Sequence, residues 1–457
     1  MAAESSWAVL PSIIIVQILA YLTPSDRLKA SATCRRWRSC LFESQLWESI
    51  TFDFTNGNAE GAKFLTQKCS SFVTYARAKL SFCTADYVLN ATRLLSRLSR
   101  NRRLRRLAIQ PKSNYVEWLE TSETQDNFVD SLIAVTKHAR KLEHLSLGCI
   151  QELTDYADTF IAVLSQHEAS KLRALHLESV KEDPDDYGLI ELPLTKLNLL
   201  HNLQVLGIDF DHLSNSLLEG FIDNHKAKLE KLIVNVHGIH PAQEQVRNHT
   251  WWRLTQHSPK LRVTLNLIHS ADGVEQLMNI LKPDIPLAIL RLFFCTTINA
   301  HAIDFISKHH CETFENLYVV EGLDDGNPNT FEDQIDDGNM LVMLAWRCKV
   351  LKHITFIGYL MESEDLACIA RLRGPGLETL QVPESCIGTV PRVELAEDED
   401  IEVEEVLTLE ELTHDVSHHL QRPWKALSDG DVPAAVIDEE ADAEQAYLPL
   451  LLQDQQW

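Results

Sequence analysis

The chain has 457 residues, of which 45% are hydrophobic and 24% are charged, so most of it is expected to bury a core, and its length exceeds what one core normally spans. Its formal net charge is −24, and an acidic protein repels phosphate backbones, which argues against nucleic acid as its main ligand. No apolar run approaches the roughly 18 residues that cross a bilayer, so no membrane partner is expected.

Three short helices are expected within residues 7–47. Pro11 suits the first turn of the first helix, where its missing N–H would have no helical partner. A T-x-x-D start signal at Thr23 predicts a second helix over 24–33, and a third is expected over 34–41. About 40 residues cannot bury all of the apolar groups of this module within one another, so an apolar face should stay open for a permanent protein partner.

The order LP, ILAYL, RW and LW along this segment resembles the F-box family. F-boxes bind the Skp adaptor, which joins them to cullin and RING subunits. The resemblance implies that the adaptor-binding residues are Leu10, Pro11, Ile14, Ile18, Leu22 and Trp37. Which of them face the adaptor and which face the module's own core stays open, and a helical cap on a repeat array is the structural alternative.

An LxxLxL element recurs through the middle of the chain, mostly at intervals of 26 to 32 residues, which is typical of leucine-rich repeats. The copies are Leu104/Leu107/Ile109, Leu142/Leu145/Leu147, Leu172/Leu175/Leu177, Leu203/Leu206/Ile208, Leu229/Leu232/Val234, an irregular copy at Val263/Leu265/Leu267, Leu287/Leu290/Leu292, Phe314/Leu317/Val319, Leu351/Ile354/Phe356 and Leu377/Leu380/Val382. Each predicts a strand with a helix after it, for example over 130–138 and 364–372. Two longer intervals, 104–142 and 314–351, indicate surface insertions.

The expected fold class is therefore α/β: a three-helix F-box followed by a leucine-rich-repeat solenoid with a curved parallel sheet, and an acidic, partly disordered tail. The expected domains are the F-box at 7–50, a helical linker at 51–100, the solenoid at 101–390 and the acidic segment at 391–457. That last segment holds 19 Asp and Glu against 3 Lys and Arg. Its final stretch, AYLPLLLQDQQW, reads either as an unattached tail or as a short docking peptide.

Residues between the leucines of each strand point to the concave face of such a solenoid, where a substrate can be read. This face becomes more apolar and aromatic toward its C-terminal half, and such residues, together with Arg, dominate binding hot spots. The predicted substrate-binding strip is Ile289, Arg291, Phe293, Tyr318 and Ile357. The alternative is that the acidic tail or an irregular strand covers this strip.

Two runs of like-charged residues each allow two interpretations. Arg93, Arg97, Arg100, Arg102, Arg103, Arg105 and Arg106 form a basic cluster, which is either an acidic-substrate patch or nuclear address, or a solvated repeat edge. The acidic run is Glu394, Glu397, Asp398, Glu399, Asp400, Glu402, Glu404 and Glu405, which either shields those arginines or is simply solvated.

The sequence holds no recognisable catalytic constellation: G-x-S-x-G elbow, P-loop and Cys/His nucleophile settings are missing. The pair His414 and His418 and the run from His309 to Cys311 lack a completing ligand set, so no metal and no cofactor is predicted. Ten cysteines without a CxxC pair favour a reduced compartment, the cytoplasm or the nucleus.

Longer segments resemble F-box proteins with degenerate leucine-rich repeats: ILKPDIPL at 280–287, the stretch from Leu344 to Val382, and HLQRPWKAL at 419–427. The resemblance implies the substrate-recognition subunit of an SCF (Skp, cullin, F-box) E3 ubiquitin ligase that marks target proteins for proteasomal degradation. Such a subunit acts by proximity rather than by bond-making chemistry, so the chain is not expected to be an enzyme. The alternative function is a non-degradative repeat scaffold that also binds the Skp adaptor.

Overall fold

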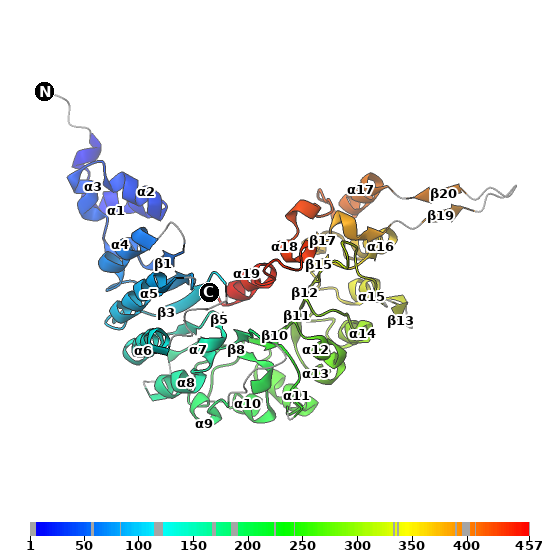
Figure 1. The fold of residues 1–457 in the computed structure, drawn as a ribbon, viewed down its shortest axis with the longest axis horizontal. Helices are drawn as coiled ribbons and strands as arrows, with labels where there is room; N and C mark the ends of the chain where they lie inside the picture. Colours follow the sequence, from blue (N-terminus) through cyan, green and yellow to red (C-terminus); the bar gives the residue numbers. More distant parts are fainter. Residues whose placement is uncertain are drawn as a thin grey trace. The chain divides into compact units, whose positions relative to one another are not determined.

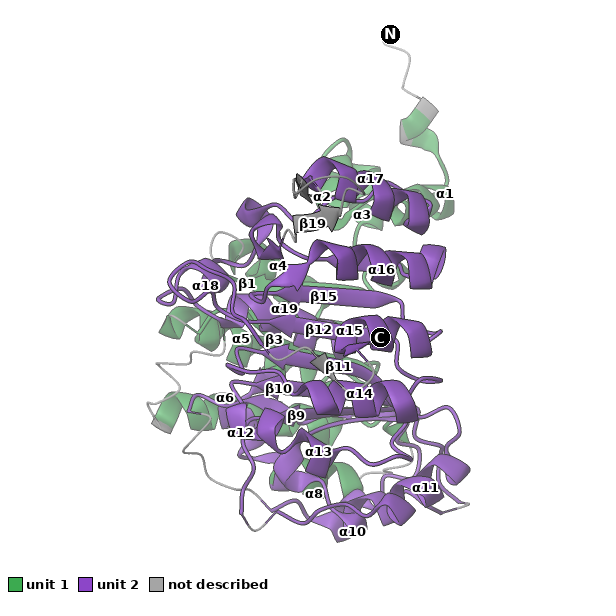
Figure 2. Cartoon of the chain, turned by 90° about the vertical axis from the view of Figure 1, so that its right-hand side faces the viewer, with its two compact units in different colours: residues 1–148, 159–172 green, residues 149–158, 173–457 purple. Residues whose placement is uncertain are grey.

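The computed structural model describes residues 6–55, 59–82, 84–113, 122–166, 171–183, 191–223, 225–241, 243–331, 334–335, 338–388, 391–394, 403–406 and 408–456. The chain divides into two compact units, residues 1–148 with 159–172, and residues 149–158 with 173–457 (Figure 2).

Unit 1 begins with the three helices that the sequence predicts and continues as alternating strands and helices (Figure 1). Its elements are α1 Ser12–Ala20, α2 Pro24–Ser31, α3 Arg35–Cys40, β1 Ser49–Phe54, α4 Ala59–Cys69, β2 Tyr75–Leu80, α5 Ala85–Leu98, β3 Arg106–Pro111, α6 Ser122–His138, β4 His144–Ser146 and most of α8 Ala157–Gln166. The strands pair in parallel in the order β1-β2-β3-β4. Thr23 caps α2 by accepting a hydrogen bond from the Asp26 N–H at 3.2 Å, as its start signal predicts.

Residues 51–100 correct the expectation of a helical linker. They contain most of β1 and all of β2, each followed by a helix, so they form two further strand–helix units. Neither strand has the LxxLxL spacing, but both alternate: Ile50, Phe52 and Phe54 of β1 are buried between more exposed neighbours. Period-two burial is the signature of a strand, and it was the signal available in the sequence.

Unit 2 is the larger part of the repeat body. Its strands are β5 Cys149–Ile150, β6 Ala174–His176, β7 Ser179–Val180, β8 Val205–Asp209, β9 Lys231–Val236, β10 Arg262–Ile268, β11 Leu287–Phe293, β12 Asn316–Val320, β13 Gln334–Ile335, β14 Gly338–Asn339, β15 His353–Ile357, β16 Met361–Glu362, β17 Thr379–Gln381, β18 Ile387–Gly388, β19 Pro391–Glu394 and β20 Val403–Val406. Its helices are α7 Gln151–Thr154, α9 Leu194–Leu197, α10 Asn215–Glu219, α11 Asn248–His257, α12 Ala271–Glu275, α13 Leu277–Ile280, α14 Ala300–His309, α15 Met340–Arg347, α16 Ser363–Arg373, α17 Leu409–Leu420, α18 Ala434–Ile437 and α19 Glu444–Asp454.

The main sheet of unit 2 is parallel throughout, in the order β6-β8-β9-β10-β11-β12-β15-β17. Together with β3 and β4 of unit 1, these strands fall on all ten LxxLxL copies, so the repeat prediction is confirmed. The leucine positions are core: Leu265, Leu290 and Leu317 are at most 2% exposed. They face the helices, and the residues between them point to the opposite side of the sheet, which we call the inner face.

The acidic C-terminal segment is ordered over 408–456. A capping box at Thr408 and Glu411 starts α17, which packs on α16. Trp424 then donates its Nε1–H to the Leu380 carbonyl of β17 at 2.8 Å, so this stretch closes the last repeat. Beyond it, α18 and α19 turn back over the inner face of unit 2 (Figure 1).

Candidate protein-docking surfaces

The first helix of the N-terminal module, residues 7–47, has one buried side and one open side. Ile15 and Leu19 are fully buried against the rest of the module, whereas Ile13 is 66% exposed and Ile14 is 37% exposed. Tyr21 at the end of the helix is 92% exposed. Large apolar side chains gathered on one open helix face are typical of a protein interface.

Arg27 holds the module together from inside. Its guanidinium donates to the Leu19 and Ala20 carbonyls of α1 and to the Leu46 carbonyl, and it lies 5.7 Å from the centre of the buried Trp47 ring. Burial lowers the pKa of Arg27. These bonds tie the C-terminal end of α1 to the segment at Leu46, so Arg27 helps to fix the orientation of α1 within the module.

The structure places the residues predicted to bind the adaptor on the outside of this module or at its edge. Pro11 and Ile14 are exposed, while Leu10, Ile18, Leu22 and Trp37 are partly buried. The Trp37 indole donates from Nε1 to the Trp7 carbonyl at 3.2 Å, which ties α3 to the segment before α1. All six side chains therefore keep accessible surface.

A second surface is a row of apolar side chains at the carboxyl ends of four neighbouring strands of unit 2. Strand register sets Ile268 beside Phe293, Phe293 beside Val320, and Val320 beside Ile357. We call these four residues the strand-end row. They lie on the inner face, because they alternate with the leucines that face the helices.

The C-terminal segment covers this row. Phe293 and Ile357 are buried, at 0% and 2% exposure, and Tyr318 is partly buried next to them. The buried cluster consists of Cys149, Val180, Ile268, Phe293, Val320 and Ile357 with Val436, Ala446, Tyr447, Leu448 and Leu451. The interpretation of residues 446–457 as an unattached tail is therefore wrong for 446–456, and the alternative that the tail covers the predicted strip is correct for Arg291, Phe293, Tyr318 and Ile357 but not for Ile289.

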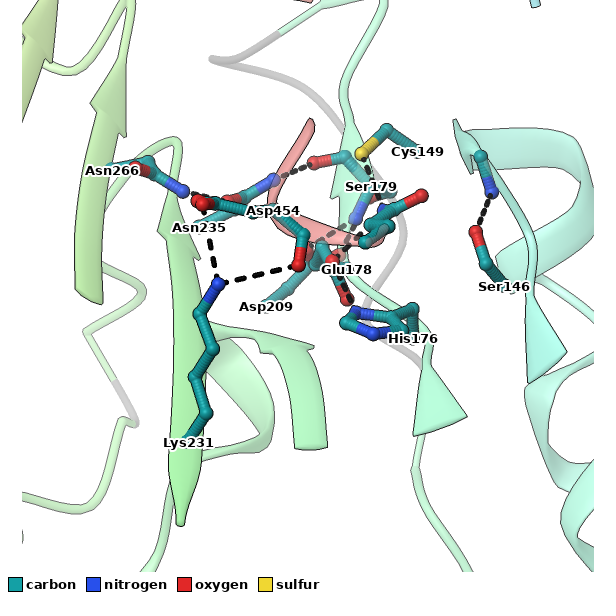
Figure 3. A network of polar contacts seen from close by, with 12 residues as sticks. Ser146, Cys149, His176, Glu178, Ser179, Asp209, Lys231, Asn235, Asn266 and Asp454 are labelled. Atoms are coloured by element: carbon teal, nitrogen blue, oxygen red, sulfur yellow. Dashed lines mark hydrogen bonds and ion pairs between the residues drawn. The ribbon is translucent and has the colours of Figure 1, made fainter. Parts of the chain in front are cut away.

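Polar contacts fix the end of α19 (Figure 3). Asp454 accepts from Arg291 Nη1 at 2.5 Å and from Lys231 Nζ at 3.2 Å. Burial would raise the pKa of Asp454, but Arg291 and Lys231 hold it below its usual value. Gln455 donates to Glu178 Oε1 at 2.8 Å, and Glu178 in turn contacts His176 Nδ1 at 3.0 Å.

Buried amides support this ion pair from the sheet. Arg291 donates to Asn266 Oδ1 at 3.2 Å, and Asn266 donates to Asn235 Oδ1 at 2.9 Å. The predicted Arg291 is thus part of the site, whereas Lys231, Asn266 and Asp454 were not predicted. Their charges and amides lie at positions with no local pattern, and only the register of neighbouring strands brings them together.

Another part of the inner face is open. A hollow of about 670 Å³ lies at the amino ends of the same strands, and the predicted Ile289 lines it. Its charged or titratable lining residues are Glu230, Lys231, Lys260, Arg262, Glu315 and His353. Glu315 bridges Lys352 at 2.8 Å and Arg262 at 3.8 Å, so charges of both signs are already paired around this hollow.

A separate cavity of about 300 Å³ lies on the leucine side of the sheet, between Val263 and Leu265 and the helix residues Trp251 and Ile280. Among the residues that the structure describes, its polar lining is His240, Gln243, Gln245, Gln276 and Asn279. It shares no residue with the strand-end row, so the two are distinct.

The structure shows contacts for two arginines of the basic cluster and describes only part of the acidic run. Arg105 of the basic cluster bridges Glu143 at 3.1 Å, and Arg106 stacks 4.6 Å from the centre of the Tyr75 ring. Residues 395–402 of the acidic run lie outside the described residues. Within the described ranges, no group of three His, Cys, Asp or Glu side chains is arranged to hold a metal ion, and no helix is long and apolar enough to span a membrane.

Comparison with known proteins agrees with the resemblance expected from the sequence. Residues 7–53 match the F-box-like family. The chain is 26% identical to F-box only protein 33 of Homo sapiens, over 92% of this chain and 83% of that protein. It is 21% identical to F-box/LRR-repeat protein 21 of Ovis aries, over 93% of this chain and 90% of that protein.

A solved structure, that of the Rad7 and Elc1 complex in yeast, aligns with 82% of this chain and 88% of its own, at 13% identity and a TM-score of 0.41. The sequence relatives confirm the expected resemblance to F-box only protein 33 and to F-box proteins with leucine-rich repeats.

Proposed function

We propose that this chain is the substrate-recognition subunit of an SCF E3 ubiquitin ligase. Its F-box-like module binds the Skp adaptor, and its repeat body binds the protein that is to be ubiquitinated and degraded. The observation that carries the proposal is the open apolar side of α1, where Ile13 and Ile14 stay exposed in a segment that matches the F-box-like family.

The proposed adaptor contacts are Leu10, Pro11, Ile14, Ile18, Leu22 and Trp37. Each keeps accessible surface, so each has area to bury against a partner. Burial of an Ile or Leu side chain contributes about 1.5 to 3 kcal/mol, so the loss of even one of these contacts should weaken adaptor binding measurably. The function is positional: the receptor holds a substrate lysine near a ubiquitin-loaded subunit.

Co-isolation from cells with the proteasome inhibited tests the proposal. Wild-type chain is expected to carry cullin, RING subunit and ubiquitinated protein, whereas a chain with Leu10→Asp and Pro11→Asp should keep its substrate and lose the cullin. Equal cullin recovery with both chains would contradict the proposal. Cullin recovery without any protein that accumulates on loss of the chain would favour the scaffold alternative.

A further inference from the structure

The segment that covers the strand-end row has the character of a bound ligand. Helix α19 has 11 residues and contains Pro449 in its interior. Isolated helices below about 12 to 15 residues are marginal in water, and an interior proline removes one hydrogen bond. The helical form of α19 therefore depends on the surface beneath it.

The two sides of α19 differ sharply. Ala446, Tyr447, Leu448 and Leu451 are buried against the sheet, whereas Gln445, Pro449 and Gln453 are exposed at four-residue spacing. The fully buried side chains thus lie on one side of the helix, with Leu450 and Leu452 partly buried beside them, as in a helical peptide held in a groove.

Each buried residue of α19 has its own contacts on the inner face of unit 2. Tyr447 packs with its ring centre 5.5 Å from that of Phe293 and 5.8 Å from that of His269. Leu448 and Leu451 fill the buried cluster, and Asp454 is held by Arg291 and Lys231. Relative to the tyrosine, these contacts fall at offsets 0, 1, 4 and 7, which is one stripe of a helix.

We infer that the strand-end row, with Arg291 and Lys231, is a receptor for short helical segments of this chemistry. The fitting segment has an aromatic residue, leucines one and four positions later and an acid seven positions later. Its partner is a substrate protein that carries such a segment and takes the place of α19. That the partner is a substrate rests on the proposed function. The receptor surface itself is inferred only from the contacts of α19.

Charge and tethering decide which segments compete. Arg291 is 6% exposed, so an occupant without an acid at its end would leave a buried cation unpaired. As part of the same chain, α19 has an effective concentration on the order of millimolar, which a free segment must overcome. Wild-type chain therefore binds a competitor weakly, and release of α19 strengthens binding.

A fluorescein-labelled peptide of residues 442–456 tests this, with full-length chains and polarisation as the measurement. A chain with Leu448→Asp and Leu451→Asp should bind it at least tenfold more tightly than wild type. The matched control, Gln445→Asp with Gln453→Asp on the exposed face of α19, should behave as wild type. A peptide with Asp454→Lys should bind the released chain at least tenfold more weakly.

A full chain with Asp454→Lys alone serves as a second release variant, since it replaces the ion pairs with Arg291 and Lys231 by like-charge repulsion and leaves the apolar residues of α19 unchanged. No gain in peptide affinity in either release variant would overturn the inference and make α19 an ordinary part of the core. A dimer of the released chain that the peptide fails to dissociate would also overturn it, because a second copy would then be the occupant.

Adaptor capture measured on the same proteins separates the two proposals. Loss of adaptor binding with intact peptide binding refutes the ligase role and supports the receptor surface. Intact adaptor binding without peptide binding to either release variant refutes the receptor surface alone.

Discussion

At the residue scale, the position of Asp454 shows how one carboxylate anchors a whole chain end. Its side chain is 11% exposed and pairs with Arg291 and Lys231. Asp454→Asn removes the charge but keeps an acceptor, so docking of α19 should weaken by about 2 kcal/mol, which is roughly a thirtyfold change in its opening equilibrium.

Hydrogen exchange of the α19 amides measures this opening directly. Glu440→Gln is the matched control, because Glu440 is an exposed carboxylate of the same segment. Exchange of α19 that stays at the wild-type rate in Asp454→Asn would show that the ion pair does not hold the helix.

Glu152 of α7 gives a pH dependence of stability. Burial, together with Asp155, Glu182 and Glu444, raises the pKa of Glu152 to about 7. The folded state therefore binds a proton more readily than the unfolded state between the ordinary value of 4.5 and about 7, so this group lowers stability as pH rises through that window.

Glu152→Gln removes the charge and should stabilise the chain by about 1 to 2 kcal/mol at pH 8, but not near pH 4.5. Thermal unfolding at both pH values measures the effect. An equal shift in melting temperature at both values would contradict the assignment to the Glu152 carboxyl.

At the element scale, α19 is a helix with a proline, Pro449, in its interior, where proline disfavours helix formation. Pro449 lies on the exposed side of the helix, so Pro449→Ala should leave the buried contacts intact while restoring helix propensity. The amides of α19 should then exchange at least tenfold more slowly, and the released peptide with this change should bind more tightly. Gln453→Ala on the same side is the control. Faster exchange in Pro449→Ala would mean that the proline is required for the docked geometry.

Elements with a strong local period were predictable from the sequence. The ten LxxLxL strands follow from leucines that must all face one helical layer, and the start signal at Thr23 placed α2, whereas Pro11 directly precedes α1 rather than lying in its first turn. Strands β1 and β2 were not predicted, because their alternating pattern is short, lacks the leucine spacing and is flanked by helices. The docking of α19 was not predicted for a different reason: its polar partners lie far away along the chain, 163 residues for Arg291 with Asp454 and 306 residues for Cys149 with Gln455.

The candidate sites divide in the same way. An open apolar face was expected because about 40 residues cannot bury all of the apolar groups of the first module, and the structure leaves Ile13 and Ile14 of α1 exposed. The residues of the predicted substrate strip lie on the inner face, as expected, because alternation fixes which residues point away from the leucine core. What covers that face is decided by long-range packing, which no local pattern encodes.

At the scale of the whole molecule, the proposed function requires one surface for the ligase subunits and another for the target protein. The first is the exposed side of α1 in unit 1, and the second is the inner face of unit 2 that α19 now occupies. A receptor of this kind needs no catalytic group of its own, because holding two proteins together supplies the rate advantage.

Affinity of the purified full-length chain for the Skp adaptor, measured by titration calorimetry, tests the central claim most directly. Ile14→Asp with Ile18→Asp should weaken binding at least a hundredfold, since each change removes about 1.5 to 3 kcal/mol of apolar burial. Leu89→Asp is the control, because Leu89 is 47% exposed on α5, outside the F-box-like module. Wild-type chain without affinity for the adaptor, or equal affinity in the Ile14→Asp with Ile18→Asp variant, would contradict the account.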